Sequence, residues 1–217
     1  MIKESTVTAA DDLIERYPVL HVCRVDMVAA VTKICDAYRG ANHKLLICGN
    51  GGSAADAEHI VGELMKGFLL PRKIQTSMRE EIKSLFPEHA DYLADHLQST
   101  LPAISLVNQI ALNTAFANDQ APDLSFAQQV LGMGEKGDVF LGISTSGNST
   151  NVIYGAEMAK VKGLTVITLT GESGGKLKGI SDICIRVPEK ETYKIQEYHL
   201  PVYHMLCIAA ENEFFGA

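Results

Sequence analysis

The segment Lys44-Leu-Leu-Ile-Cys-Gly-Asn-Gly-Gly-Ser53 changes from apolar to glycine-rich within a few residues, and a helical pattern follows it. Its apolar run does not alternate with polar residues, which is typical of a strand buried on both faces of a parallel sheet. The glycines allow positive φ angles and a close approach of a ligand to the backbone. Ser53 is a suitable N-cap, and a helix N-terminus attracts anions. The segment therefore predicts a strand, a turn that binds a phosphate or sugar phosphate, and a helix.

This turn does not fit the common nucleotide-binding patterns. Gly49, Gly51 and Gly52 are not spaced as G-x-G-x-x-G, and no Walker A Gly-Lys-Ser/Thr follows them. On the helix, His59 and Glu63 are four residues apart and so lie on one face, where both could reach a common metal ion or substrate. Such pairs are also frequent on solvated helix faces, so this pair alone leaves both interpretations open.

A second polar turn, Ser144-Thr-Ser-Gly-Asn-Ser149, follows a buried strand predicted at 139–143 and precedes a helix predicted at 151–162. Its hydroxyls, backbone N–H groups and helix N-terminus suit the terminal oxygens of a phosphate ester. The alternative is a serine-rich loop that only caps the helix. We favour phosphate binding, because Ser149 or Thr150 alone would serve as a cap.

Strand and helix signals alternate along the chain. Short apolar runs predict strands at 45–48, 102–107, 139–143, 164–169 and 183–187, and helical periodicity fills most of the intervals. This order predicts an α/β fold with a doubly wound parallel sheet and helices on both faces. In such folds ligands bind at the carboxyl ends of the strands, where both polar turns fall.

Four segments lie outside this simple alternation. Residues 1–40 predict an N-terminal helical arm divided by a proline, and residues 73–100 predict a charged helical pair, also divided by a proline. Residues 113–119 form a polar cluster that predicts a turn. Residues 195–214 predict a helix with polar side chains among apolar neighbours, and such side chains are costly to bury unless they are paired or functional.

Composition argues against several classes of protein. Of the 217 residues, 47% are hydrophobic, so disorder is not expected, and a single domain over 1–217 suffices. The 19 Lys and Arg against 26 Asp and Glu give a net charge of −7, which argues against general nucleic-acid binding. The five cysteines include no C-x-x-C pair, which indicates thiols in a reducing compartment. With no leader pattern and no apolar run that could span a bilayer, we expect a soluble, cytoplasmic protein without a membrane partner.

Taken together, the motifs resemble the sugar isomerase (SIS) domain family and, within it, the phosphoheptose isomerases. The residues that carry the resemblance extend over most of the chain: Gly49-Asn-Gly-Gly-Ser53, His59 with Glu63, Asn118-Asp119, Gly142-Ile-Ser-Thr-Ser-Gly-Asn-Ser149, Leu169-Thr-Gly171 with Gly174-Gly-Lys176, Arg186-Val-Pro188, and Ile195-Gln-Glu-Tyr-His199 with His204. The resemblance implies aldose–ketose isomerisation of a sugar phosphate through an enediol. The first candidate substrate is sedoheptulose 7-phosphate, with D-glycero-D-manno-heptose 7-phosphate as product.

The resemblance also implies roles for single residues. Glu63 is then the general base and His204 the general acid, which are the two groups that an enediol mechanism needs. The implied substrate-binding residues are Asn50, Gly51, Gly52, Ser53, Asp119, Ser144, Thr145, Ser146, Ser149 and Gln196. Some members of the family bind zinc, and the matching positions hold His59, Glu63, Gln196 and His204. The resemblance further implies a homotetramer.

Two features depart from the family pattern. Residues 73–100 look like an insertion before the next strand, and a Tyr-Lys pair at 193–194 stands where the family tends to carry an Asp before Gln196. Two other functions therefore stay open: isomerisation of a different sugar phosphate, and a non-catalytic SIS module that binds or senses a sugar phosphate. Retention of both Glu63 and His204 favours the enzyme, because a binding module needs neither a base nor an acid.

Overall fold

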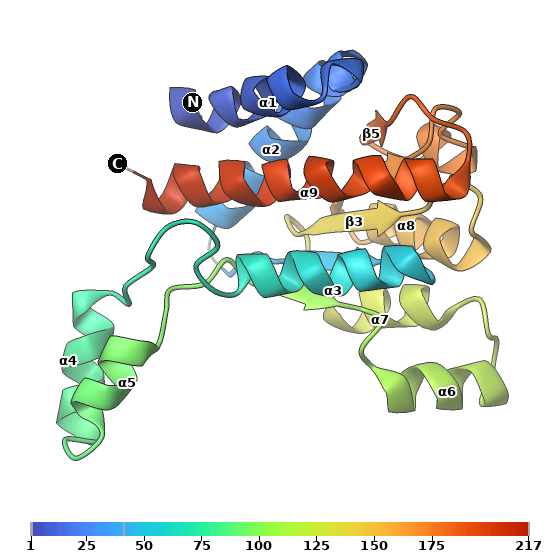
Figure 1. Cartoon of the computed structure of the whole chain (residues 1–217). Coiled ribbons are helices and arrows are strands. Elements are labelled where there is room, and N and C mark those ends of the chain that lie inside the picture. Colours follow the sequence, from blue (N-terminus) through green and yellow to red (C-terminus); the bar gives the residue numbers. More distant parts are fainter. Residues whose placement is uncertain (1, 41, 217) are drawn as a thin grey trace.

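The computed structural model describes residues 2–40 and 42–216 of the chain. Within these residues, five strands form one parallel sheet with the order β2-β1-β3-β4-β5. The strands are β1 (Leu45–Cys48), β2 (Ala103–Ser105), β3 (Val139–Ile143), β4 (Thr165–Thr170) and β5 (Ile183–Arg186). Helices cover both faces of the sheet (Figure 1), so the predicted doubly wound α/β fold is confirmed.

The strand order places the two predicted polar turns next to each other. β1 lies between β2 and β3, so the direction in which the chain builds the sheet reverses at β1. Cys48, the last residue of β1, is paired with Gly142 near the end of β3. The turns that follow these two strands therefore share the carboxyl edge of the sheet at its switch point, where doubly wound folds bind their ligands.

The helices form two layers and an outlying group. One face of the sheet packs against α1 (Glu4–Arg16), α2 (Arg24–Arg39), α3 (Gly52–Leu64) and α9 (Thr192–Phe215), with the 3-10 helix η1 (Pro18–Cys23) between the first two. The other face packs against α7 (Ser125–Met133) and α8 (Thr150–Val161). The remaining elements are α4 (Thr76–Leu85), α5 (Ala90–His96), α6 (Ile110–Asp119) and η2 (Lys176–Gly179). No helix of the described residues is both long and apolar enough to span a bilayer.

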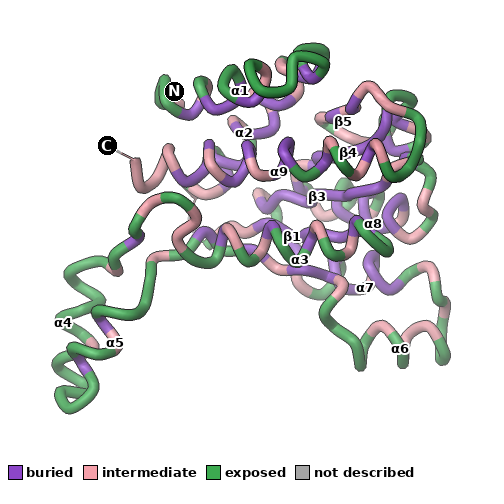
Figure 2. Tube along the Cα trace, in the orientation of Figure 1, coloured by how far each residue is buried: buried purple, intermediate pink, exposed green. Residues whose placement is uncertain are grey.

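Successive strand residues supply two separate hydrophobic cores. Leu45, Ile47 and Leu141 belong to the core on the α9 side, whereas Leu46 and Phe140 belong to the core under α7 and α8. All five side chains are at most 1% exposed, and Figure 2 shows the buried residues concentrated along the strands and the adjoining helices. Burial on both faces is the reason that these strands read as continuous apolar runs in the sequence.

Helices α4 and α5 project away from the sheet as a pair (Figure 1). The helical pair predicted at 73–100 is therefore confirmed. Arg79 on α4 is ion-paired with Asp95 on α5 at 2.8 Å, and an antiparallel bridge between Lys73 and Gln98 closes the base of the pair. Its status as an insertion stays a prediction.

Two local predictions are wrong. Residues 113–119, expected as a polar turn, lie in helix α6, because the side-chain amide of Asn113 donates to two carbonyls of the preceding loop rather than ending the helix. Ser53 is not the N-cap of α3, since Gly51 occupies that position. Gly51 has a φ of +58°, which lets the chain enter the helix earlier, and Ser53 is buried in the first turn.

Candidate active site

The turn after β3 is a compact, serine-rich loop. The hydroxyls of Ser144 and Ser149 are hydrogen-bonded at 2.9 Å, and the N–H of Asn148 donates to the hydroxyl of Ser146 at 3.1 Å. Ser149 is the N-cap residue of α8, although its side chain makes no capping hydrogen bond. The free N–H groups and the positive dipole end of α8 therefore lie directly beside the hydroxyls, which is a suitable arrangement for a phosphate.

A second turn holds this loop from the other side. Gly147 has a φ of +66°, and a Cβ atom there would overlap the carbonyl of Gly174. The N–H of Lys176 donates to the side-chain oxygen of Asn148 at 3.0 Å, and the N–H of Leu177 donates to the carbonyl of Gly147 at 3.1 Å. The close approach of the two backbones allows only glycine at position 147, so the shape of the serine-rich loop depends on that residue.

The glycine-rich turn after β1 is tied to the same edge. Asn50 and Asn151 exchange two hydrogen bonds between their side-chain amides, at 2.8 and 2.9 Å. The pair joins the turn before α3 to the first turn of α8. Asn50, Gly51 and Gly52 are exposed. The two turns, at residues 49–52 and 144–149, thus lie together where the N-termini of two helices meet, and we call them the polar edge.

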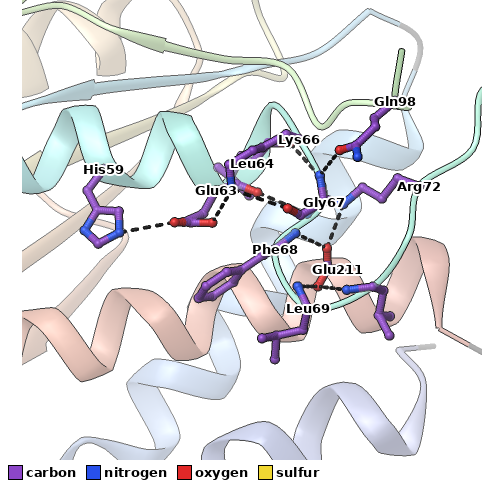
Figure 3. Close-up of polar contacts among 11 residues, drawn as sticks. His59, Glu63, Leu64, Lys66, Gly67, Phe68, Leu69, Arg72, Gln98 and Glu211 are labelled. Carbon is purple, nitrogen blue, oxygen red and sulfur yellow. Dashed lines mark hydrogen bonds and ion pairs between the residues drawn. The ribbon is translucent and has the colours of Figure 1, made fainter. Parts of the chain in front are cut away.

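The predicted base and acid meet farther along α3 and α9. Glu63 Oε1 lies 3.2 Å from His59 Nε2, as Figure 3 shows, and the ring centroids of His59 and His204 are 5.0 Å apart. The other carboxylate oxygen of Glu63 lies 3.0 Å from Lys66 Nζ. The Glu63 side chain is only 13% exposed. The structure therefore brings His59, Glu63 and His204 together.

Tyr203 fixes the hydrogen bonding of His59. Its hydroxyl lies 2.9 Å from His59 Nδ1. Because the carboxylate of Glu63 only accepts, His59 Nε2 donates to it, and Nδ1 accepts from the tyrosine hydroxyl. Burial raises the pKa of Asp56 to about 6, and the nearby Tyr203 and His59 partly oppose that rise. The sequence analysis missed Tyr203 and Asp56, although Asp56 is three residues before His59 and helical spacing alone places it nearby.

The environment of His204 favours the neutral imidazole. Burial is the main reason that its pKa is lowered, and the neighbouring His59 lowers it further. Its Nε2 atom is buried and has no hydrogen-bond partner among the described residues. The ring is flanked by Phe68 at 5.5 Å and by Tyr203 at 5.0 Å between centroids. A neutral imidazole with a free nitrogen can accept a proton, accept a hydrogen bond from a substrate hydroxyl or bind a metal ion.

Gln196 and Asp119 lie apart from these three residues. Gln196 is eight residues before His204 on α9, and its amide lies against Gly52 in the first turn of α3, at the polar edge. Asp119 ends α6 and accepts a hydrogen bond from the side chain of Asn118 at 2.8 Å. No hydrogen bond among the described residues joins Asp119 to the other predicted site residues.

The residues predicted for zinc are only partly gathered. His59, Glu63 and His204 are neighbours, but His59 and Glu63 are hydrogen-bonded to each other, and Gln196 lies about two helical turns away along α9. Within the described part of the chain, no three His, Cys, Asp or Glu side chains are arranged to hold a metal ion. The chemistry of the donor set suits a divalent metal, and the unpartnered nitrogen of His204 is the observation that favours one.

Comparison with known proteins identifies the family. Residues 23–171 match the SIS domain, and the chain therefore belongs to the SIS domain family. Curated relatives to which the chain is similar include phosphoheptose isomerases. The phosphoheptose isomerase of Aneurinibacillus thermoaerophilus is 39% identical over 85% of this chain and 79% of its own length, and that of Sulfurimonas denitrificans is 35% identical over 88% and 85%.

Solved structures agree with this assignment. The phosphoheptose isomerase from Neisseria gonorrhoeae superposes with a TM-score of 0.71 and 30% identity, over 95% of this chain and 93% of that one. The enzyme from Francisella tularensis gives a TM-score of 0.74 and 28% identity, over 96% and 94%. The resemblance read from the sequence motifs is therefore confirmed.

Proposed function

We propose that this chain is a phosphoheptose isomerase, which converts sedoheptulose 7-phosphate to D-glycero-D-manno-heptose 7-phosphate. The observation that carries the proposal is that Glu63 and His204 both contact His59, between α3 and α9, on helices whose N-terminal ends lie toward a polar edge suited to a phosphate. The membership of the chain among phosphoheptose isomerases supports the choice of substrate. An isomerisation assay with sedoheptulose 7-phosphate tests it directly.

The residue types suit proton transfer through an enediol. A carboxylate at position 63 removes a proton from carbon 1 of the ketose and returns a proton to carbon 2, which makes the aldose. The imidazole of His204 transfers a proton between the oxygens on carbons 1 and 2. Phosphate binding at the polar edge holds the far end of the sugar, so the reacting carbons are presented to the base in a fixed orientation.

We expect Ser146→Ala to weaken substrate binding with little effect on turnover. Hydrogen bonds to charged groups are worth about 1.5–3 kcal/mol, so the Michaelis constant for the sugar phosphate should rise roughly 10-fold or more. Steady-state kinetics with purified enzyme measure this. Ser84→Ala, an exposed serine on α4, is the control and should leave both constants unchanged. An unchanged Michaelis constant in Ser146→Ala would remove that residue from the phosphate site.

We propose that the site takes one zinc ion per chain, held by His59, Glu63, Gln196 and His204. The support is the donor set and the buried, unpartnered Nε2 of His204. When bound, zinc would act as a Lewis acid on the sugar oxygens. Metal analysis after dialysis against zinc should find one equivalent in the wild type and much less in His204→Ala. Equal and negligible zinc in both proteins would contradict this assignment.

We also propose a homotetramer, as the family resemblance implies. The support is a row of exposed valines on η1 and α2, in which Val19, Val22 and Val25 are 42%, 56% and 76% exposed. Light scattering should give four times the 23.5 kDa mass of one chain. Val25→Glu should lower that mass by placing a charge in an apolar contact. A monomeric wild type at micromolar concentration would defeat the proposal.

A cytoplasmic location is likewise a proposal. Its support is the state of the five cysteines, which all lie in the described residues and are all free thiols, four of them buried. Burial raises the pKa of Cys23 to about 11 and that of Cys35 to about 12, so these thiols are unreactive and suit a structural role in a reducing compartment.

A further inference from the structure

The segment that follows α3 is anchored by a buried ion pair that takes no direct part in the proposed reaction. Arg72 Nε lies 2.8 Å from Glu211 Oε1, and both side chains are 0% exposed. Burying two charges is costly, and the attraction between them repays that cost only when their other hydrogen-bonding atoms are also satisfied. The partners of the remaining atoms therefore indicate what this pair does.

Glu211 binds the backbone of that segment. Its carboxylate accepts the N–H groups of Phe68, Leu69 and Leu70 at 2.8, 2.7 and 3.1 Å. Burial by itself raises the pKa of Glu211, but the hydrogen bonds from Phe68, Leu69 and Arg72 outweigh it, so the pKa is lowered and the carboxylate stays charged. One ionised side chain of α9 thus fixes three consecutive residues of the loop.

Arg72 binds the end of helix α3. Its guanidinium donates to the carbonyl of Leu64 at 2.7 Å and to that of Glu63 at 3.1 Å. Carbonyls in the last turn of a helix have no partner within the helix. The pair therefore joins the C-terminal end of α3, the loop at 65–71 and α9 into one unit, as Figure 3 shows. Gln98 adds a bond from the α5 side, since its side-chain oxygen accepts the N–H of Gly67 at 2.6 Å.

The anchored loop carries two residues that contact the predicted base and acid. Lys66 Nζ lies 3.0 Å from Glu63 Oε2, and the ring of Phe68 lies 5.5 Å from that of His204. Glu211 lies seven residues after His204, which places the two side chains on one side of α9, two turns apart. A shift of the loop would therefore move groups in contact with both Glu63 and His204.

We propose that Arg72 and Glu211 are positioning residues of the isomerase site. They hold the loop at 65–71 so that Lys66 and Phe68 keep Glu63 and His204 in the arrangement that proton transfer needs. The proposal rests on the proposed function, in which Glu63 is the base. Displacement of a reacting group by about 1 Å can cost 10²-fold in rate, so the pair acts on turnover without touching the substrate.

The test compares two buried carboxylates of α9. Glu211→Gln weakens the anchor, whereas Glu213→Gln weakens a carboxylate that is also nearly buried but binds the N-terminal helix, through the N–H of Lys3, the hydroxyl of Thr6 and an ion pair with Arg39. Both variants should melt at a lower temperature. Only Glu211→Gln should lose turnover, by about 10- to 100-fold with the Michaelis constant within about two-fold of wild type.

Several outcomes decide the matter. Should Glu211→Gln fail to fold, Arg72→Lys keeps the charge but not the paired bonds to the α3 carbonyls, and it should show the same selective loss of turnover. Wild-type turnover in a folded Glu211→Gln or Arg72→Lys, or an equal loss in Glu213→Gln, would overturn the proposal. Glu63→Gln is measured beside these variants. If Glu63→Gln is inactive, a contrary result with Arg72 or Glu211 refutes only their positioning role. If Glu63→Gln is active, the proposal that Glu63 is the base is refuted.

Discussion

Glu63→Gln should lower the turnover of sedoheptulose 7-phosphate by about 10³-fold, within the 10²- to 10⁴-fold range of general base catalysis. The substitution keeps the size of the side chain and removes the group that accepts the proton. It also turns the acceptor that faces His59 and Lys66 into a neutral amide, yet it leaves the polar edge intact. The Michaelis constant should therefore change much less than the turnover number.

The control for this variant lies on the same helix. Glu58 is exposed on α3, five residues before Glu63, and Glu58→Gln removes the same charge from the protein. We expect it to keep wild-type kinetics. Turnover in Glu63→Gln close to that of Glu58→Gln would exclude Glu63 as the base, whatever the substrate proves to be.

Gly147→Ala should nearly abolish binding of the sugar phosphate and destabilise the fold. The left-handed conformation at this position costs a residue with a Cβ about 1–2 kcal/mol, and the added atom meets the carbonyl of Gly174. Either the serine-rich loop or the turn at 174–176 must move. Because the loop shapes the phosphate site, kcat/KM should fall by at least about 100-fold, the cost of losing one or two hydrogen bonds to a charged group.

Gly132→Ala is the matched control for this substitution. Gly132 lies in α7, and a Cβ atom there has nothing within 4 Å. Alanine is favoured over glycine in a helix by about 0.5–1 kcal/mol, so this variant should be at least as stable as wild type and equally active. Thermal melting and kinetics of both variants separate a general glycine effect from the specific need at 147. Tight binding by Gly147→Ala would mean that the loop does not hold the phosphate.

The sheet could be predicted because the local sequence of each strand shows that the strand is buried. The run at 45–48 is apolar on both faces, and the turn at 49–52 directly follows it, so local sequence sufficed for the strand, the turn and the helix. Helix α6 could not be predicted as easily. The side-chain amide of Asn113 donates to carbonyls of the preceding loop, and neither helical periodicity nor turn composition indicates these hydrogen bonds.

The candidate site likewise has one part that local sequence predicts and one part that it does not. The spacing of His59 and Glu63 is local, whereas the contacts of His59 with Tyr203 and His204 join positions more than 140 residues apart. Arg72 and Glu211 are 139 residues apart, and neither belongs to a motif. Spacing alone therefore gives no signal for the residues that orient the predicted base and acid. Only the packing of α9 beside α3 reveals them.

The most direct test of the central claim is conversion of sedoheptulose 7-phosphate in deuterated water, followed by nuclear magnetic resonance. An enediol mechanism with Glu63 as base predicts D-glycero-D-manno-heptose 7-phosphate that carries solvent deuterium at carbon 2, and formation of this product about 10³-fold more slowly with Glu63→Gln. Conversion without any deuterium in the product, together with wild-type turnover by Glu63→Gln, would contradict the mechanism. Absence of conversion by the folded wild type, with and without added zinc, would contradict the proposed function.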